Sequence, residues 1–255
     1  PVHGALMLLY GELAEHYFAI ENHTRNIRQD ITFVKTLIPV GRTVRLLDLG
    51  CGSGEHLALF AREGYECVGI DSSEAMLRVA KERNSEGKIS YALNSVVSFD
   101  YFEEFDIVTS FFGSLDYLLN DEDIDAVLWN TWRALKSGGL AVFELWNAAP
   151  ILMIGKKEMG IVSTTEKPHL RIDRERGFEL VSTDPAIVEV RYRYHVRSNG
   201  SLRMLEDTHR MRAFALDELK LFIAKNGFKL KSYYANAQKD GFSPTSNRTV
   251  IVLEK

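Results

Sequence analysis

The sequence of 255 residues contains only two cysteines and no long hydrophobic run. Its apolar stretches, such as residues 5–10, stop well short of the ~20 residues that a membrane-spanning helix needs, so no membrane partner is expected. Cys51 lies in a glycine-rich turn and Cys67 in an apolar strand pattern, which indicates reduced thiols rather than a disulfide framework. No metal-ligand cluster stands out. The sequence starts at Pro1. A removed targeting peptide therefore stays open, and we expect a cytoplasmic protein.

Clustered basic residues are also lacking. Acidic side chains outnumber basic ones in residues 1–160, residues 161–255 carry a small basic excess, and the net charge is −4. Phosphate backbones are bound by dense Lys and Arg, so nucleic acid is not expected as a partner. Hydrophobic residues make up 45% and charged residues 26% of the chain. This composition is typical of a compact globular protein without a long disordered tract.

The chain instead alternates strand and helix patterns. A helical pattern covers residues 10–38 and ends at Pro39 and Gly41. Strands are then expected at 43–49, 66–70, 88–93, 105–110 and 140–145. The intervening helices are expected at 56–61, 73–83 and 121–135. This alternation predicts an α/β fold with a doubly wound, mostly parallel sheet.

The pattern changes after Trp146. Residues 187–197 alternate apolar and polar side chains with period two, Asn199-Gly200 is a hairpin turn signal, and residues 201–213 form the expected returning strand. A helix at 216–226 and strands at 228–234 and 249–254 would then close the edge of the sheet. We therefore expect a helical leader or lid at residues 1–42 and a cofactor-binding core at residues 43–160. An antiparallel β insert on the substrate side is expected at residues 161–213, and a C-terminal part that completes the sheet at residues 214–255.

The most informative motif is a glycine turn between the first strand and helix. Its spacing is Gly50-x-Gly52-x-Gly54, whereas the dinucleotide fingerprint needs glycine where this chain has Glu55, and no Gly-Lys-Ser/Thr of a P-loop follows. Asp71 ends the second strand, where a carboxylate can accept both hydroxyls of a cofactor ribose. Together these residues indicate an adenosine-type ligand. The alternative is that the glycines only make a turn and Asp71 only caps the next helix.

At this point the chain resembles the class I S-adenosylmethionine (SAM)-dependent methyltransferases. The resemblance is carried by residues 46–54 (LLDLGCGSG), 68–71 (VGID), 105–108 (FDIV) and 135–140 (LKSGGL). It implies a Rossmann-like, seven-stranded sheet with an antiparallel β insert after strand five, SAM as cofactor and S-adenosylhomocysteine as product. The family often has Gly-Asp after strand three, where this chain has Asn94-Ser95. The cofactor contacts implied by the resemblance are Tyr17, Arg25, Asp48, Gly50, Gly52, Gly54, Asp71, Ser72, Met76, Asn94, Ser95, Val96 (through its backbone) and Phe111.

Within that class the chain is similar to small-molecule N-methyltransferases of the aminodeoxysugar N,N-dimethyltransferase and glycine N-methyltransferase types. The matches are residues 14–17, 24–25, 112–118 and 207–210. They imply that Tyr17 and Arg25 close over the methionine end of SAM and that Tyr117, which replaces a histidine, borders the acceptor amine. The catalytic residues are expected to be Tyr117 and His209. The substrate contacts are expected to be Ser114, Tyr117, Trp146, Asn147, His209 and Arg210.

Methyl transfer from a sulfonium needs the acceptor lone pair in line with the S–CH₃ bond, and a neutral amine needs no strong base. A hydroxyl acceptor would want a base. The candidates are His16, His56 and His209, although none has an evident carboxylate partner in the sequence, and each could be an ordinary core or exposed residue. Arginines also alternate on the predicted strands and could grip an acidic group of the substrate or form a solvated sheet face. They are Arg191, Arg193, Arg210 and Arg212.

Other classes of function stay as alternatives. A nicotinamide oxidoreductase is disfavoured by the glycine spacing, and a non-catalytic SAM-binding or partner-binding module is the second alternative. Residues 110–113 (SFFG) lack the Asn/Asp-Pro-Pro-aromatic motif of enzymes that methylate DNA bases or glutamine. We therefore expect a methyltransferase acting on a small soluble acceptor, with an amine preferred, O-methylation with a histidine base as the alternative, and a homodimer left open.

Overall fold

A central β-sheet organises the core. The computed structural model describes residues 7–21, 26–38, 41, 43–84 and 88–255. The sheet strands are β1 (Arg45–Leu49), β2 (Glu66–Asp71), β3 (Ile89–Leu93), β4 (Phe105–Ser110), β5 (Leu135–Trp146), β10 (Lys229–Tyr234) and β11 (Arg248–Glu254). Their order is β10-β11-β5-β4-β1-β2-β3; β11 runs antiparallel to β10 and to β5, and the other neighbouring pairs are parallel. This is the expected Rossmann-like sheet of seven strands.

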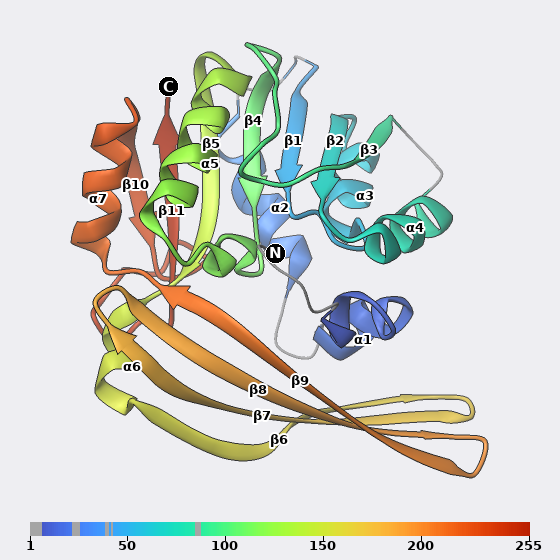
Figure 1. Ribbon diagram of the computed structural model, residues 1–255. Helices are drawn as coiled ribbons and strands as arrows, with labels where there is room; N and C mark the ends of the chain where they lie inside the picture. The colour runs from blue at the N-terminus through green and yellow to red at the C-terminus, as the bar shows by residue number, and fades with distance from the viewer. Residues whose placement is uncertain (1–6, 22–25, 39–40, 42, 85–87) are drawn as a thin grey trace.

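Helices cover both faces of this sheet (Figure 1). Helices α5 (Asp121–Ala134) and α7 (Leu216–Lys225) pack on one face, and α2 (Ile27–Lys35) and α3 (Glu55–Arg62) pack on the other. Neighbouring strand residues serve opposite faces, since Leu47 belongs to the first cluster and Leu46 to the second. Helix α4 (Glu74–Arg83) begins as the sequence predicts, because Ser73 accepts a hydrogen bond from the N–H of Met76.

The insert after strand five is a second, four-stranded sheet. Helix α6 (Ala148–Ile154), which the sequence pattern did not predict, leads into it. Its antiparallel strands, in spatial order, are β6 (Lys156–Lys167), β7 (Leu170–Thr183), β8 (Ala186–Ser198) and β9 (Ser201–Ala213). The sheet lies below the carboxyl ends of the parallel strands (Figure 1). Residues such as Val188, Val190 and Tyr194 are buried on its inner face.

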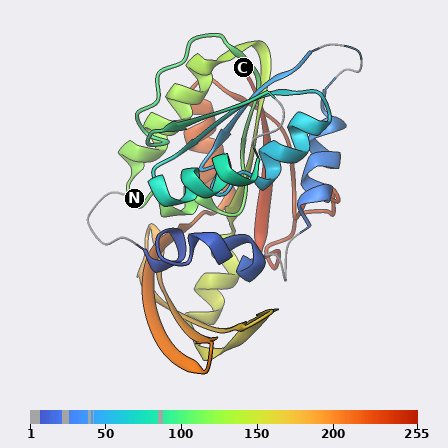
Figure 2. The same cartoon turned by 90° about the vertical axis from the view of Figure 1, so that its right-hand side faces the viewer.

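The first part of the leader, residues 7–21, lies between the core and the insert (Figure 2). The sequence pattern predicts one helical stretch over residues 10–38, but the described residues form η1 (Leu8–Tyr10), η2 (Ala14–His16), α1 (Tyr17–Glu21) and then α2. Tertiary contacts override the local pattern here. The Ser73 hydroxyl donates to the carbonyl oxygen of Tyr10 at 2.7 Å, and the Thr165 hydroxyl donates to that of Ala19 at 3.1 Å. The leader is therefore anchored to both sheets.

The two ends of the insert meet at the core. Phe214 and Asn147 form a parallel bridge, in which the N–H of Phe214 donates to the carbonyl of Trp146 at 2.7 Å and the N–H of Ala148 donates to that of Phe214 at 3.0 Å. These bonds fix the insert relative to the carboxyl end of β5. Within the described part of the chain, no helix is long and apolar enough to cross a membrane.

Candidate active site

The turn between β1 and α3 is the first feature of the site. Gly50, Gly52 and Gly54 have φ values of +70°, +55° and +80°, in the left-handed region that favours glycine. Space restricts Gly50 as well, because a Cβ there would lie 2.6 Å from the Cβ and Oγ of Ser114. The turn leads directly into α3. Such a turn presents backbone N–H groups to a nucleotide-like ligand.

Asp71 ends β2 beside this turn. Its Oδ2 accepts the N–H of Gly52 and its Oδ1 accepts the N–H of Ser73, both at 2.8 Å. Burial raises the pKa of Asp71, and the backbone N–H groups oppose this effect. The end of β3 lies alongside, because the N–H of Asn94 donates to the carbonyl of Asp71 at 3.0 Å. The carboxylate is thus held in one orientation, and it keeps acceptor capacity for a ligand because its two oxygens together offer about four lone-pair sites.

A second acid lies beneath the turn. Asp48 is 3% exposed and accepts a hydrogen bond from the Thr109 hydroxyl at 2.7 Å. Burial raises the pKa of Asp48 to about 6. Nearby, Nε2 of His56 lies 3.1 Å from Oδ2 of Asp30, and the His56 ring stacks on Phe111 with centroids 4.9 Å apart. The Asp48 carboxylate is thus bonded to a buried core group, the Thr109 hydroxyl, below the turn.

Four side chains from three distant segments form a continuous polar chain. The hydroxyl of Tyr10, on η1, lies 2.8 Å from that of Tyr117, on η4 (Ser114–Tyr117). The Tyr117 hydroxyl lies 2.6 Å from Nδ1 of His209 on β9. Nε2 of His209 lies 3.1 Å from Oδ2 of Asp207, off the axis of a straight hydrogen bond. This Tyr10–Tyr117–His209–Asp207 chain gives His209 the carboxylate partner that the sequence did not reveal.

Burial and local contacts set the protonation of the two tyrosines and of Asp207. Desolvation raises the pKa of both Tyr10 and Tyr117 well above that of an exposed tyrosine, so both phenols are neutral at physiological pH. Burial alone would also raise the pKa of Asp207, but the contact with His209 and the N–H of Leu9 outweigh it and lower the pKa. The chain therefore has a carboxylate at one end and two neutral hydroxyls at the other.

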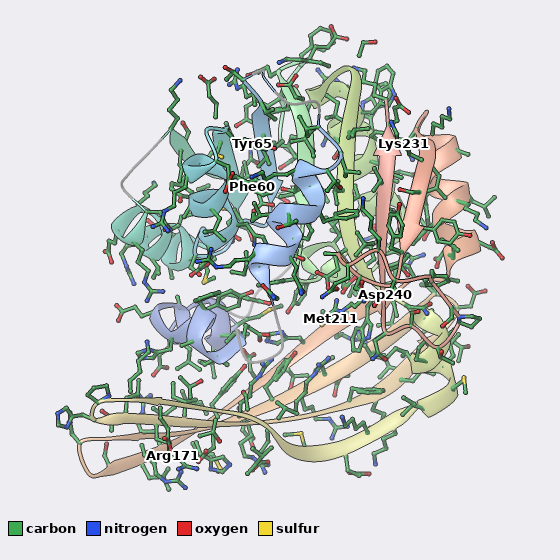
Figure 3. All side chains as sticks on the ribbon, turned by 180° about the vertical axis from the view of Figure 1, so that it is seen from behind. Phe60, Tyr65, Arg171, Met211, Lys231 and Asp240 are labelled. Atoms are coloured by element: carbon green, nitrogen blue, oxygen red, sulfur yellow. The ribbon has the colours of Figure 1, made fainter. Side chains whose placement is uncertain are left out.

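The neutral end of the chain opens into a cavity of about 700 Å³. Its walls come from the leader, the inner face of the insert, Phe112 after β4, Glu144 on β5, and the segment from Ala235 to Val250. Met211, one of the lining residues, lies where the insert meets the core (Figure 3). The aromatic lining residues are Tyr10, Tyr17, Phe112, Tyr117 and Tyr192. A cavity of this size holds a drug-sized molecule.

Comparison with known proteins points to a reaction class. Residues 46–139 match a family model described as a methyltransferase domain. The chain is 27% identical to a protein of Geobacillus sp. (strain WCH70) whose name assigns it, provisionally, to the methyltransferases, over 83% of this chain and 84% of that protein. It is 34% identical to the dTDP-4-amino-2,3,4,6-tetradeoxy-D-glucose N,N-dimethyltransferase of Saccharopolyspora spinosa, over 46% and 45%. The crystal structure of a SAM-dependent methyltransferase from Clostridium acetobutylicum ATCC 824 shares the fold with a TM-score of 0.81 at 14% identity, over 95% and 97%.

Together, these matches support a SAM-dependent methyltransferase that resembles the class I enzymes. The residues around the glycine turn fit the cofactor SAM. Asp71 keeps the acceptor capacity that ribose hydroxyls need. A Cβ at Gly52 would lie 3.2 Å from Cε of Met76 and 3.8 Å from Cε1 of Tyr17, so glycine leaves room between the turn and these two side chains.

The methyltransferase fold brings the predicted cofactor residues together. The segments after β1, β2, β3 and β4 meet at one sheet edge, because parallel strands end on the same side. This edge carries Gly50, Gly52, Gly54, Asp71, Ser72, Asn94, Ser95, Val96 and Phe111. Tyr17 and Tyr117 line the neighbouring cavity, and His209 lies directly behind Tyr117. Arg25 lies outside the described residues.

Some predicted substrate contacts do not line the cavity. The Ser114 hydroxyl donates to the carbonyl of Gly50 at 3.3 Å. The Asn147 amide donates to the carbonyls of Pro244 and Ser246 at 3.3 and 2.7 Å, so it holds the loop before β11. Arg210 is exposed on the outer face, since its neighbour His209 faces inward and alternate strand residues face opposite sides. Trp146 is buried behind the lining residue Arg176.

The remaining arginines suggested for an acidic substrate are paired elsewhere. Arg191 and Arg193 lie on the outer face of the insert, where Arg191 pairs with Glu179 and Arg193 with Glu206 at 2.8 Å. Arg212 is buried, and it pairs with Asp121 at 2.8 Å and with Glu218. Like Arg210, these three do not line the cavity. The alternation on β8 and β9 was predicted correctly, but it does not reveal which face meets the substrate.

Sequence reasoning missed the arginines that do line the cavity: Arg174 and Arg176 on β7, and Arg248 at the start of β11. The i, i+2 spacing of Arg174 and Arg176 was a visible signal that both share one face of a strand. The other two candidate bases, His16 and His56, do not line the cavity.

Proposed function

We propose that this methyltransferase transfers the methyl group of SAM to an amine nitrogen of a small molecule bound in the cavity between core and insert. The observation that carries the proposal is the Tyr10–Tyr117–His209–Asp207 chain, whose two tyrosines line this cavity. The amino-sugar N,N-dimethyltransferase of S. spinosa supports an amine acceptor.

The first task of the residues is to position the acceptor. SAM, when bound, supplies an electrophilic methyl group on a sulfonium centre. Transfer then requires the lone pair of a neutral amine in line with the S–CH₃ bond, and positioning supplies most of the rate. The neutral hydroxyls of Tyr10 and Tyr117 can accept N–H bonds of the amine without competing as nucleophiles. This orients the nitrogen.

The second task is to remove a proton, because the nitrogen keeps its own protons when it gains the methyl group, and the cationic product must lose one proton to become a neutral amine. In our proposal the product amine passes that proton to the Tyr117 oxygen while the Tyr117 hydroxyl donates its own proton to Nδ1 of His209, 2.6 Å away. The imidazolium is then stabilised by the Asp207 carboxylate at 3.1 Å. The proton would then reach solvent by way of Asp207, the partly exposed end of the chain.

A second candidate acceptor is a hydroxyl. A hydroxyl must lose its proton during transfer, so O-methylation needs a base. The pairing of His209 with Asp207 favours this candidate more than the sequence alone did. Mass analysis of products from amine and hydroxyl acceptors separates N-methylation from O-methylation.

The test is S-adenosylhomocysteine release with an acceptor panel, repeated with Tyr117→Phe. Loss of the hydroxyl should lower kcat by roughly 100-fold, within the range for a positioned proton-transfer group, and leave the affinity for SAM unchanged. Tyr65→Phe is the matched control, because Tyr65 packs on Phe60 far from the cavity (Figure 3). A Tyr117→Phe variant with the kcat of the wild type would show that the hydroxyl has no role in the reaction.

A further inference from the structure

The inner face of the insert carries charge where apolar side chains are expected. On β7, Ile172 and Phe178 are buried on this face, and Arg174 and Arg176 stand between them in the same alternation. Burying a guanidinium costs free energy unless it is paired and hydrogen-bonded. The partners of these two arginines therefore show what the cavity is built to hold.

Among the described residues, three arginines line the cavity, and two of them are neutralised by acids. Arg174 pairs with Glu21 at 2.7 Å, and both side chains are largely buried. Arg248 lies 3.2 Å from Asp116 and 3.5 Å from Glu144. Asp116 does not line the cavity. The acids among its described lining residues are Glu21, Glu144 and Asp30, and Asp30 is engaged with His56. Each of these three acids is thus already in contact with a basic group.

Arg176 is different. It makes no ion pair with any described residue. Its guanidinium lies 5.3 Å from the ring centroid of Trp146 and 5.9 Å from that of Tyr192, and its Nε has no hydrogen-bond partner in the described part of the chain. Aromatic faces stabilise the cation but provide no acceptor in the plane of its N–H groups. Arg176 therefore brings an uncompensated positive charge and free donors to the cavity wall.

Two further donors beside Arg176 lack acceptors. The Ser163 hydroxyl lines the cavity from β6, and it is buried without a hydrogen-bond partner among the described residues, as is Nε of Arg174. Ser163 pairs with Arg174 across the two strands, and Arg176 follows Arg174 on the same face. Three neighbouring donor atoms, Nε of Arg176, Nε of Arg174 and the Ser163 hydroxyl, therefore have no acceptor among the described residues, although another nitrogen of Arg174 pairs with Glu21. This pattern calls for an acceptor-rich, negatively charged ligand group.

We propose that Arg176, Ser163 and Arg174 form a subsite for an anionic group, a carboxylate or a phosphate, on the acceptor molecule. This rests on the proposed function: the acceptor is an amine that also carries a negative charge, bound with the anion at β6 and β7 and the amine at Tyr10 and Tyr117. An amino acid and a nucleotide-linked amino sugar share this chemistry. The subsite would hold the far end of the acceptor and so help orient its amine.

Direct binding tests the subsite without any turnover. The protein saturated with S-adenosylhomocysteine is titrated calorimetrically with inorganic pyrophosphate and, separately, with glutarate, at constant ionic strength because screening weakens charge contacts. Arg176→Gln should weaken binding of the anion at least tenfold. Arg191→Gln removes the same charge from the outer face of the insert and should leave binding unchanged. The affinity for S-adenosylhomocysteine should be the same in all three proteins.

The two titrations distinguish the sources of the anion, since pyrophosphate represents a nucleotide diphosphate and glutarate a carboxylate. Any of three results would overturn the subsite. Arg176→Gln binds the anions as tightly as the wild type, Arg176→Gln and Arg191→Gln lose the same affinity, or neither anion binds to the wild type. The proposed function fails separately, if no amine or hydroxyl acceptor yields S-adenosylhomocysteine. Once active acceptors are known, each amine that carries an anionic group is compared with an analogue that lacks this group. The wild type should show a higher kcat/KM for the anionic acceptor, and Arg176→Gln should erase this preference.

Discussion

Replacing Asp48 by asparagine should stabilise the protein at neutral pH. The folded protein raises the pKa of Asp48 from 3.8 to about 6, chiefly by burial. A difference of about two pKa units corresponds to ~3 kcal/mol at ~1.4 kcal/mol for each unit. Asparagine keeps an oxygen that can accept the Thr109 hydrogen bond and carries no charge to bury. We therefore expect Asp48→Asn to gain up to ~3 kcal/mol at pH 7.5.

The sign of this effect depends on pH. A carboxyl with a raised pKa binds its proton more tightly in the folded state, so its contribution is fully present below pH 3.8 and is lost as the pH rises through about 6. The difference between Asp48→Asn and wild type should thus be small near pH 4 and reach its full size above pH 7. Urea unfolding of the protein without cofactor, followed by far-UV circular dichroism at both pH values, measures this difference.

Asp106 provides the matched control on the neighbouring strand. It is also buried, but its carboxylate lies 3.1 Å from Nζ of Lys136 and accepts the N–H of Arg45 at 2.8 Å. Asp106→Asn removes a paired charge and should destabilise the protein at pH 7.5, the opposite of the effect at Asp48. The reasoning is refuted if Asp48→Asn is no more stable than wild type at pH 7.5, or if its advantage is the same at pH 4.

Two other substitutions test the cofactor edge and the cavity wall. Asp71→Ala should weaken SAM binding by about 10- to 100-fold in calorimetry, since hydrogen bonds to a charged group contribute roughly 1.5–3 kcal/mol. Glu74, an exposed residue on α4, provides the control, and Glu74→Ala should leave SAM binding unchanged. Equal affinities of the two variants would contradict the ribose role of Asp71. Glu21→Gln should lower the free energy of unfolding by about 3 kcal/mol, because it leaves Arg174 buried without its acid. Glu179→Gln, on the outer face, should change the free energy of unfolding by less than about 0.5 kcal/mol. Similar losses in the two variants would argue against a buried pair.

The parallel core was predictable because its signals are local and repeated. The boundaries of β4 agree with the sequence prediction, and α4 begins at the predicted serine cap. Glycine punctuation and short apolar runs specify where a strand ends and a helix begins, whatever the rest of the chain does. The same reasoning located the cofactor edge, since the segments after parallel strands must meet at one side of the sheet.

The leader and the start of the insert were harder because long-range contacts determine them. The pattern over residues 10–38 suggests a continuous helix, yet its first part forms short turns that reach Ser73 on the core and Thr165 on the insert. Strand β6 begins at Lys156, N-terminal to the expected boundary at residue 161, and most of its side chains are exposed. A strand that buries few side chains shows little alternation of apolar and polar residues in its sequence, so its start is hard to predict.

The contrast between His209 and the arginines shows what strand periodicity can decide. Residues i and i+2 share a face of a strand, so Asp207 and His209 could have been paired from the spacing Asp-x-His alone. Periodicity cannot say which of the two faces is covered. Arg191 and Arg193 follow the same rule as Arg174 and Arg176, but the first pair meets glutamates at the surface and the second faces the cavity. Only the packing of the leader against the insert separates a solvated face from a binding face, and this explains why the anion subsite became visible in three dimensions.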